Sequence, residues 1–242
     1  MVQTIAFFSF YYLSFYLVVS LTALITAFHQ HHMQCPLCST SAITPYFTDK
    51  KRPYLQCSEC DLVFVHPDFL PSAHSEKSEY DKHENSFDDE GYKQFLRKLI
   101  NPLLSLINTG EKALDFGCGP AAVLAKMLED VGLDVDIYDP FYAPFEKVLN
   151  RKFDVITCTE AIEHFHHPAK EWAILTGMLN PNGILAIMTK RVIDKERFST
   201  WHYKNDPTHV SFFSERTFSY LARRDGFDIK FPGSDVVLMR KL

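Results

Sequence analysis

The sequence predicts an α/β fold whose central sheet is parallel and ends in an antiparallel hairpin. Three observations indicate this fold. From residue 112 onward, short apolar runs with the length of buried strands alternate with segments whose apolar residues have helical spacing. One of these runs breaks at two glycines and leads directly into a helical pattern. The last two runs, Phe227–Phe231 and Val236–Met239, are separated by the turn sequence Pro232-Gly233-Ser234, which is typical of a hairpin.

The break at the two glycines is the most informative stretch of the chain. Lys112–Phe116 is predicted to be the first core strand, Gly117 and Gly119 form a turn, and Ala121–Glu129 has the period of a helix. Glycine lets the backbone approach a ligand closely, and a helix N-terminus offers free N–H groups. This unit therefore predicts a nucleotide cradle. It is not a dinucleotide fingerprint, because Ala122 stands where the third glycine belongs, and it lacks the Lys-Ser/Thr pair of a P-loop.

The other core elements follow in the same alternation. The second strand, Leu133–Tyr138, ends at Asp139. Only 13 residues separate Asp139 from the next strand at Phe153, which leaves room for a short turn and a stub. The later elements are predicted as strand Phe153–Cys158, helix Pro168–Leu179, a turn at 179–183, strand Ile184–Thr189 and a helix from its cap Ser214 to Gly226.

Residues 1–32 form an apolar N-terminal segment. Ile5–Phe28 contains no charged residue and is long enough to cross a bilayer as a helix. Two interpretations stay open: a transmembrane anchor, and an upstream extension in front of a start at Met33. A cleaved signal is disfavoured because no Lys or Arg precedes the apolar run.

Two C-x-x-C pairs follow this segment. Cys35 and Cys38 are separated from Cys57 and Cys60 by 18 residues, which lies in the range of zinc ribbons. Four thiolates can close a tetrahedral shell around Zn²⁺ and hold a segment that is too small for its own core. Residues 33–66 are therefore predicted to be a zinc ribbon, with short strands at 45–48, 53–56 and 63–65. Two roles stay open: recognition of a substrate or partner, and a metal-stapled lid on the main domain, which is preferred.

Residues 67–110 are predicted to be a linker and an entry helix. The stretch from Pro67 to Asp89 is polar and punctuated by proline, so an irregular solvated connector is expected. Within it, residues 80–83 could fold over a ligand pocket. The entry helix covers Tyr92–Ile107, and Pro102 should kink or split it.

Three stretches together resemble class I S-adenosylmethionine (SAM)-dependent methyltransferases: Leu114–Pro120, Tyr138–Pro140 and Phe153–His164. The likeness covers roughly residues 114–242 and is greatest to bacterial members that carry a zinc ribbon and have no assigned substrate. It implies a Rossmann-like class I methyltransferase sheet in a domain at 111–242, with SAM as cofactor.

The same resemblance implies a set of cofactor-binding residues. Asp139 is expected to hold the ribose, because one carboxylate can accept from two adjacent hydroxyls. The acid that normally contacts the adenine amino group has no candidate in the shortened region after it. The full expected set is Asp115, Gly117, Cys118, Gly119, Asp139 and Glu160.

Glu160-x-x-Glu163-His164 follows a central strand, and His209 lies on a later loop. Two carboxylates and two imidazoles can bind a divalent ion with open positions for a substrate. The pattern resembles the metal site of small-RNA 2′-O-methyltransferases, and its first part that of ubiquinone-pathway catechol O-methyltransferases, which implies Mg²⁺ or Mn²⁺. Two other interpretations stay open: His209 or His164, assisted by Glu160, as a metal-free catalytic base, and a loop anchor without a catalytic role.

The predicted function is SAM-dependent methylation of an oxygen on a small molecule or other hydroxylated acceptor. RNA is a less favoured acceptor, because the formal net charge of −5 gives the chain no general basic character. The alternative is a non-catalytic SAM-binding scaffold or regulator whose ribbon binds a partner. The expected location is the cytoplasm, since the cysteine pattern suits a reducing compartment; with residues 1–32 as an anchor, it becomes a membrane-bound protein with its catalytic domain in the cytoplasm.

Overall fold

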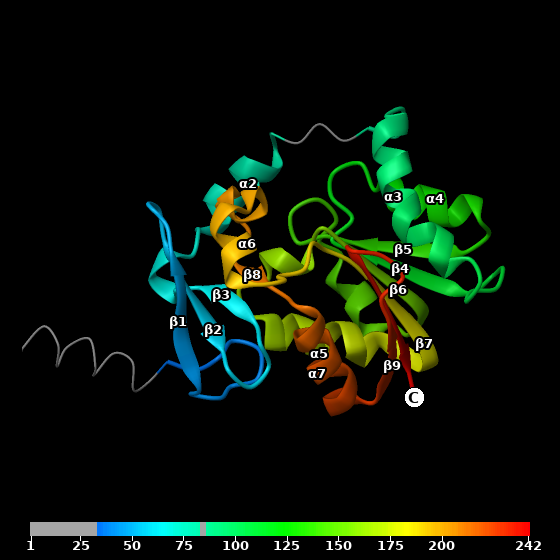
Figure 1. Cartoon of the computed structure of the whole chain (residues 1–242). Coiled ribbons are helices and arrows are strands. Elements are labelled where there is room, and N and C mark those ends of the chain that lie inside the picture. Colours follow the sequence, from blue (N-terminus) through cyan, green and yellow to red (C-terminus); the bar gives the residue numbers. More distant parts are fainter. Residues whose placement is uncertain (1–32, 83–85) are drawn as a thin grey trace, which may run out of the picture.

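The computed structural model describes residues 33–82 and 86–242 (Figure 1). The expectations for the apolar segment 1–32 lie outside these residues. Within the described ranges, no helix has the length and apolar character needed to cross a membrane.

The larger sheet has six strands in the order β5-β4-β6-β7-β10-β9. The pairs β5–β4, β4–β6 and β6–β7 are parallel, whereas β10 is antiparallel to both β7 and β9. This arrangement confirms the predicted α/β sheet with a C-terminal antiparallel hairpin. The strands are β4 (Lys112–Phe116), β5 (Asp134–Tyr138), β6 (Phe153–Thr159), β7 (Leu179–Met188), β9 (Phe227–Lys230) and β10 (Val236–Lys241).

Helices cover both faces of this sheet (Figure 1). Because side chains alternate along a strand, Leu185 and Ile187 of β7 pack with α5 and α7, whereas Ile184 and Ala186 pack with α3 and α4. The four helices are α3 (Glu90–Leu103), α4 (Val123–Asp130), α5 (Pro168–Met178) and α7 (Glu215–Asp225). Central strands that are buried on both faces explain why their sequences are continuous apolar runs.

The sheet stops at β5 on one side. After Asp139 the chain forms a single bridge between Asp139 and Ala143 and the short helix η2 (Glu146–Asn150). Within the described residues no strand lies beyond β5 in this sheet. The short turn and stub predicted from the 13-residue spacing are thereby confirmed.

Two predicted elements differ from the structure. The turn expected at 179–183 is already part of β7, because Leu179 pairs with Phe153 of β6 and the irregularity is taken up as a register shift, with Asn182 at φ 63°. The connector at 67–89 contains two helices, η1 (Pro67–Phe69) and α2 (Ala73–Tyr80). No apolar period marks α2, and Ser72 caps its N-terminus by accepting from the Ser75 N–H.

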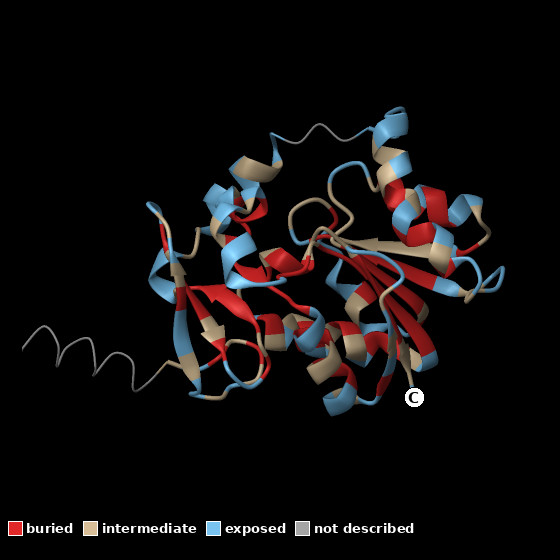
Figure 2. Cartoon of the chain, viewed as in Figure 1, coloured by how far each residue is buried: buried red, intermediate tan, exposed pale blue. Residues whose placement is uncertain are grey.

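The ribbon strands β1 (Ile43–Thr48), β2 (Pro53–Cys57) and β3 (Val63–Val65) form an antiparallel sheet. Its fourth strand, β8 (Ser211–Phe212), comes from the C-terminal half of the chain and pairs with β3. Figure 2 shows that buried residues continue from the central sheet into this smaller sheet. The ribbon is therefore built into the core domain. The remaining helices are η3 (Ile162–His164), α6 (Lys195–Thr200) and η4 (His202–Asn205).

Candidate active site

A cavity of about 680 Å³ opens where β4, β5 and β6 end. Open parallel sheets bind ligands at this edge, and small-molecule sites usually span about 300–1,000 Å³. The glycine turn, the loop 138–142 and residues 159–161 line it. The helices α2 and α5 and the loop that carries Asp206 and His209 complete the wall.

The glycine turn has the backbone that the sequence predicts. Gly117 and Gly119 have φ values of 78° and 64°, which favour glycine. A Cβ atom added to Gly117 would lie 2.6 Å from Cβ of Ala161. Ala122 enters α4 at φ 44° and supplies no side-chain cap. The backbone N–H of Ala125 bonds to the Asp115 carboxylate, and the N–H groups before it stay available at the cavity wall.

The two carboxylates that flank this turn have different surroundings. Asp115 is only 2% exposed, accepts from the Thr157 hydroxyl at 2.8 Å and does not line the cavity. Burial raises the pKa of its carboxyl group to about 6, and hydrogen bonding opposes this. The structure thus places Asp115 beneath the strand end, as a support of the turn rather than a cavity group.

Asp139 does line the cavity. Its carboxylate accepts from the backbone N–H of Gly119 at 3.1 Å and from those of Phe141 and Tyr142 at 2.8 and 3.1 Å. The carboxylate therefore joins the glycine turn to the loop after β5. Each carboxylate oxygen has two lone pairs, so these bonds leave acceptor capacity for a ligand hydroxyl.

Three buried side-chain oxygens at the cavity have no hydrogen-bond partner among the described residues: Thr159 Oγ1, Glu160 Oε1 and Glu171 Oε2. Buried polar atoms in folded proteins are nearly always paired. Their common position in the cavity wall points to a ligand that brings hydrogen-bond donors. Glu171, on α5, is an acid that the sequence pattern did not single out.

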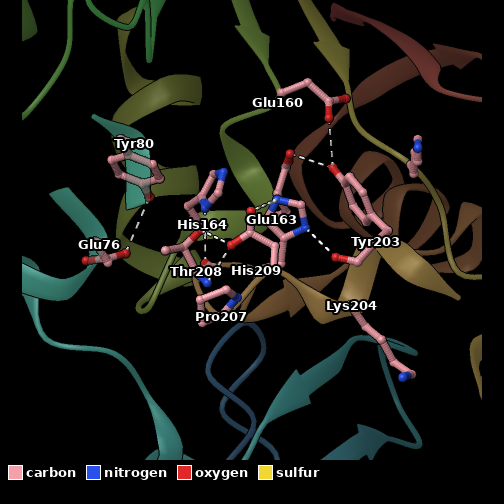
Figure 3. Close-up of polar contacts among 12 residues, drawn as sticks. Glu76, Tyr80, Glu160, Glu163, His164, Tyr203, Lys204, Pro207, Thr208 and His209 are labelled. Atoms are coloured by element: carbon pink, nitrogen blue, oxygen red, sulfur yellow. Dashed lines mark hydrogen bonds and ion pairs between the residues drawn. The ribbon is translucent and has the colours of Figure 1, made fainter. Parts of the chain in front are cut away.

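Tyr203 links the two predicted glutamates. Its hydroxyl lies 2.5 Å from Glu163 Oε1 and 3.3 Å from Glu160 Oε2, and Thr189 donates to the other oxygen of Glu163 (Figure 3). Burial and the neighbouring carboxyl raise the pKa of Glu160 to about 8, and burial raises that of Glu163 to about 7. Glu160 also has φ 47°, a strained backbone conformation that persists only where surrounding contacts hold it.

Two imidazoles meet beside these carboxylates, with ring centres of His164 and His209 4.7 Å apart. The acceptor of His164 Nδ1 is the Thr208 carbonyl at 3.1 Å, and that of His209 Nδ1 is the Tyr203 carbonyl at 2.7 Å (Figure 3). A carbonyl only accepts, so each Nδ1 carries the proton and each Nε2 keeps its lone pair. Burial lowers the pKa of both rings, that of His209 to about 3, so both are neutral at pH 7.

Comparison with known proteins decides the family. A family model described as a methyltransferase domain matches residues 89–230. The chain belongs to this methyltransferase family. The chain is a SAM-dependent methyltransferase.

Individual relatives are more distant. The ubiquinone biosynthesis O-methyltransferase of Pasteurella multocida (strain Pm70) is 29% identical over 113 residues, 34% of this chain and 47% of that protein. The chain thus spans about half the length of the curated relative it matches.

Two solved structures are also similar. Burkholderia thailandensis 1,6-didemethyltoxoflavin-N1-methyltransferase has 16% identity and a TM-score of 0.48, covering 81% of this chain and 98% of that one. Magnesium protoporphyrin IX methyltransferase from Synechocystis PCC 6803, solved with bound SAM, has 12% identity and a TM-score of 0.46, covering 73% and 95%.

The methyltransferase cavity suits SAM. A positive-φ turn that a Cβ would fill, the free N–H groups of α4 and the carboxylate of Asp139 lie on its wall. The unpaired oxygens of Thr159, Glu160 and Glu171 match a ligand that carries an ammonium, an adenine amine and two ribose hydroxyls. Cys118 also lines the cavity, and burial raises the pKa of its thiol to about 12, so it is present as a neutral thiol.

We expect Gly117→Ala to weaken SAM binding at least tenfold. The substitution forces alanine into a left-handed conformation, which costs ~1–2 kcal/mol, and pushes its Cβ against Ala161. Isothermal titration with SAM measures the effect. Gly177→Ala in α5 is the matched control, because its Cβ would meet no atom within 4 Å. Equal affinity in the two variants would contradict a cofactor site at the turn.

The structure brings three of the four predicted divalent-cation ligands together. One ligand atom from each of Glu163, His164 and His209 lies within 4.8 Å of the others. Two imidazoles and a carboxylate suit a divalent transition metal with open positions, and the backbone carbonyls on both Nδ1 atoms are the usual outer partners of metal-binding histidines. Glu160 lies outside this cluster, since its contact with Glu163 runs through Tyr203. Glu160 as a fourth ligand therefore stays a prediction, which the geometry of this cluster does not support.

The four ribbon cysteines also form a cluster. Sγ of Cys35 lies 3.5 Å from that of Cys60, and Sγ of Cys38 lies 3.5 Å from that of Cys57. All four lie within 4.8 Å of one another. Zn–S bonds of about 2.3 Å in a tetrahedron need sulfur separations of about 3.8 Å. The cluster therefore has the donor set and size of a structural zinc site.

Besides Glu171, sequence reasoning missed three groups of this site. Tyr80 lines the cavity from α2, with its ring 5.0 Å from that of His164. Tyr203 joins the two glutamates, and Arg52 of the ribbon contacts the His209 loop. Tyr80 and Arg52 lie far from the motifs in the sequence, whereas Tyr203 lies six residues before His209. Only the polar stretch 80–83, noted as a segment that could cover a pocket, gave a signal.

Proposed function

We propose that the protein transfers the methyl group of SAM to a hydroxyl oxygen of a small molecule bound in the same cavity. The observation that carries this proposal is the pair of neutral imidazoles, each with an unprotonated Nε2, beside the cofactor wall. A hydroxyl group must lose a proton when it is methylated, whereas many amines arrive with a free lone pair. The arrangement supplies two acceptors for that proton.

The transfer is an in-line displacement in which the new O–CH₃ bond forms as the S–CH₃ bond breaks. SAM supplies the electrophilic methyl group on its sulfonium. His209 Nε2 accepts the acceptor's hydroxyl proton, while the Tyr203 carbonyl holds its Nδ1–H. Such base catalysis typically contributes about 10²–10⁴-fold to the rate. Tyr80 and Phe165 line the same cavity and give its wall an aromatic character.

A divalent ion is the second part of the proposal. Glu163, His164 and His209 would hold it, and the ion would lower the pKa of the substrate oxygen. In that case Thr189 and Tyr203 keep the Glu163 carboxylate in place through their hydroxyl groups. The metal-free route and the metal-assisted route thus use the same histidines, as a base in the first and as ligands of the ion in the second.

The test is product analysis with methyl-labelled SAM against separate pools of phenols and catechols, sugars, amines and RNA. We expect methyl ethers from a hydroxylated pool. Products confined to the amine or RNA pool would contradict the proposal. EDTA treatment, followed by zinc analysis to show that the ribbon metal is retained, separates the routes: turnover that is lost and then restored by Mn²⁺ requires the divalent ion.

A further inference from the structure

The ribbon reaches the active-site loop through one buried side chain. Arg52, which precedes β2, is 7% exposed. Its guanidinium donates to four backbone carbonyls of the segment 204–209: Lys204 at 2.9 Å, Asp206 at 2.7 Å, Pro207 at 2.8 Å and His209 at 2.9 Å. Its Nε donates to the Tyr54 hydroxyl at 3.0 Å.

A planar guanidinium is suited to this task. Its donors have a fixed fork geometry, so several carbonyls gathered around it are held in one arrangement. Among the described residues, Arg52 makes no ion pair with a carboxylate, and backbone carbonyls instead satisfy its buried donors. Because the buried guanidinium of Arg52 bonds mainly to the segment 204–209, we infer that the conformation of this segment depends on Arg52.

The segment that Arg52 holds orients both imidazoles. The Tyr203 carbonyl accepts from His209 Nδ1, and the Thr208 carbonyl accepts from His164 Nδ1. Arg52 itself bonds to the carbonyl of His209. Arg52 therefore bonds directly to the backbone of His209, and its acceptors on Pro207 and His209 flank Thr208 in the chain.

Two further contacts connect the turn between β1 and β2, which carries Asp49 and Arg52, to the segment 204–209. Lys204 Nζ lies 3.5 Å from Asp49 Oδ2, and the Tyr54 hydroxyl donates to that same oxygen at 3.0 Å. Asp49 in turn accepts from the backbone N–H of Arg52 at 2.9 Å. The β1–β2 turn and the 204–209 segment thus form one hydrogen-bonded unit.

We propose that Arg52 is a positioning residue for methyl transfer, and that the ribbon serves the active site through it. This inference rests on the proposed function, in which His209 faces the acceptor. The ribbon then sets the geometry of the proton-accepting histidines, and the cysteine cluster contributes by holding the β1–β2 turn in place. This role goes beyond a lid that packs on the main domain.

The test is Arg52→Lys, which keeps the positive charge and removes the planar set of guanidinium donors. We expect kcat to fall about 10–100-fold, because small misplacements of reacting groups have effects of this size, with SAM affinity within twofold. The ¹H–¹³C imidazole signals of His209 and His164 should shift. Arg223→Lys at an exposed site of α7 is the matched control and should change none of these.

Tyr54→Phe is the second variant, since it removes one partner of Arg52 and keeps the buried ring. We expect a smaller fall in kcat with the same signal shifts. An unchanged kcat and unshifted histidine signals in both variants, in protein whose His209→Ala form is inactive, would overturn the inference. Wild-type turnover in His209→Ala would instead overturn the proposed function, so the two failures are distinguishable.

Discussion

His209→Ala is expected to remove methyl transfer and to leave SAM binding intact. Its Nε2 accepts the proton of the acceptor in the metal-free route and holds the ion in the other, and its Nδ1–H is already bound to the Tyr203 carbonyl. Loss of a positioned base costs about 10²–10⁴-fold in rate. We expect kcat to fall by that factor, measured by transfer of labelled methyl, while the Kd for SAM stays within twofold because the glycine turn and Asp139 are untouched.

His202→Ala is the control for this prediction, because His202 is exposed on the helix η4 just before His209. It should retain wild-type turnover. Addition of Mn²⁺ to His209→Ala should not restore activity, since the carboxylate of Glu163 and one imidazole would be left as ligands. Normal turnover of His209→Ala would remove this residue from the mechanism.

Replacing Cys57 and Cys60 together by serine should unfold the ribbon and abolish activity. Structural zinc contributes about 10–16 kcal/mol of apparent binding free energy in small zinc domains, so its loss should destabilise the ribbon although β3 also pairs with β8 of the main domain. Loss of the cluster frees the β1–β2 turn and with it Arg52, so His209 loses its support. We expect the zinc content to fall to zero, the melting temperature to drop and kcat to be lost.

Cys158→Ser is the matched control, because this cysteine lies in β6 outside the cluster. It should keep one zinc per chain and most of its activity. A double variant that binds no zinc and still turns over at the wild-type rate would show that the ribbon does not act on the site.

The parts of the fold that follow from local rules were predictable from the sequence. Apolar runs marked β4, β6, β7 and β10, because these strands are largely buried on both faces. Ser214 and Gly226 gave the limits of α7, and the structure shows a capping box at the first and a left-handed φ of 75° at the second. The spacing after Asp139 predicted the short edge.

Elements that depend on tertiary contacts were not predictable in this way. Helix α2 is polar on every side, so no period marks it, yet Tyr80 and Glu76 point into the cavity from it. The strand β8 is two residues long and exists only because β3 lies beside it.

The candidate site also has residues that motifs predict and residues that only tertiary contacts bring into the site. The motifs gave Glu163, His164 and His209 as neighbours in space, because the ends of strands in an open sheet meet at one edge. They did not show that Tyr203 lies between Glu160 and Glu163 or that Arg52 holds the loop. No motif in the sequence marks Arg52. Its burial results from contacts with residues more than 150 positions later, which no local pattern reports.

The shared four-stranded sheet has a consequence for how the protein can be divided. Phe212 of β8, together with Val192 and Phe198, packs under the ribbon residues Tyr54 and Val63. A shorter chain that starts at residue 67 would leave this apolar surface and an unpaired strand edge in water, which are the features that drive self-association. Residues 89–230, which the family model matches, therefore lack the ribbon strands against which their own strand at 211–212 packs, and a shortened protein should keep residues 33–66.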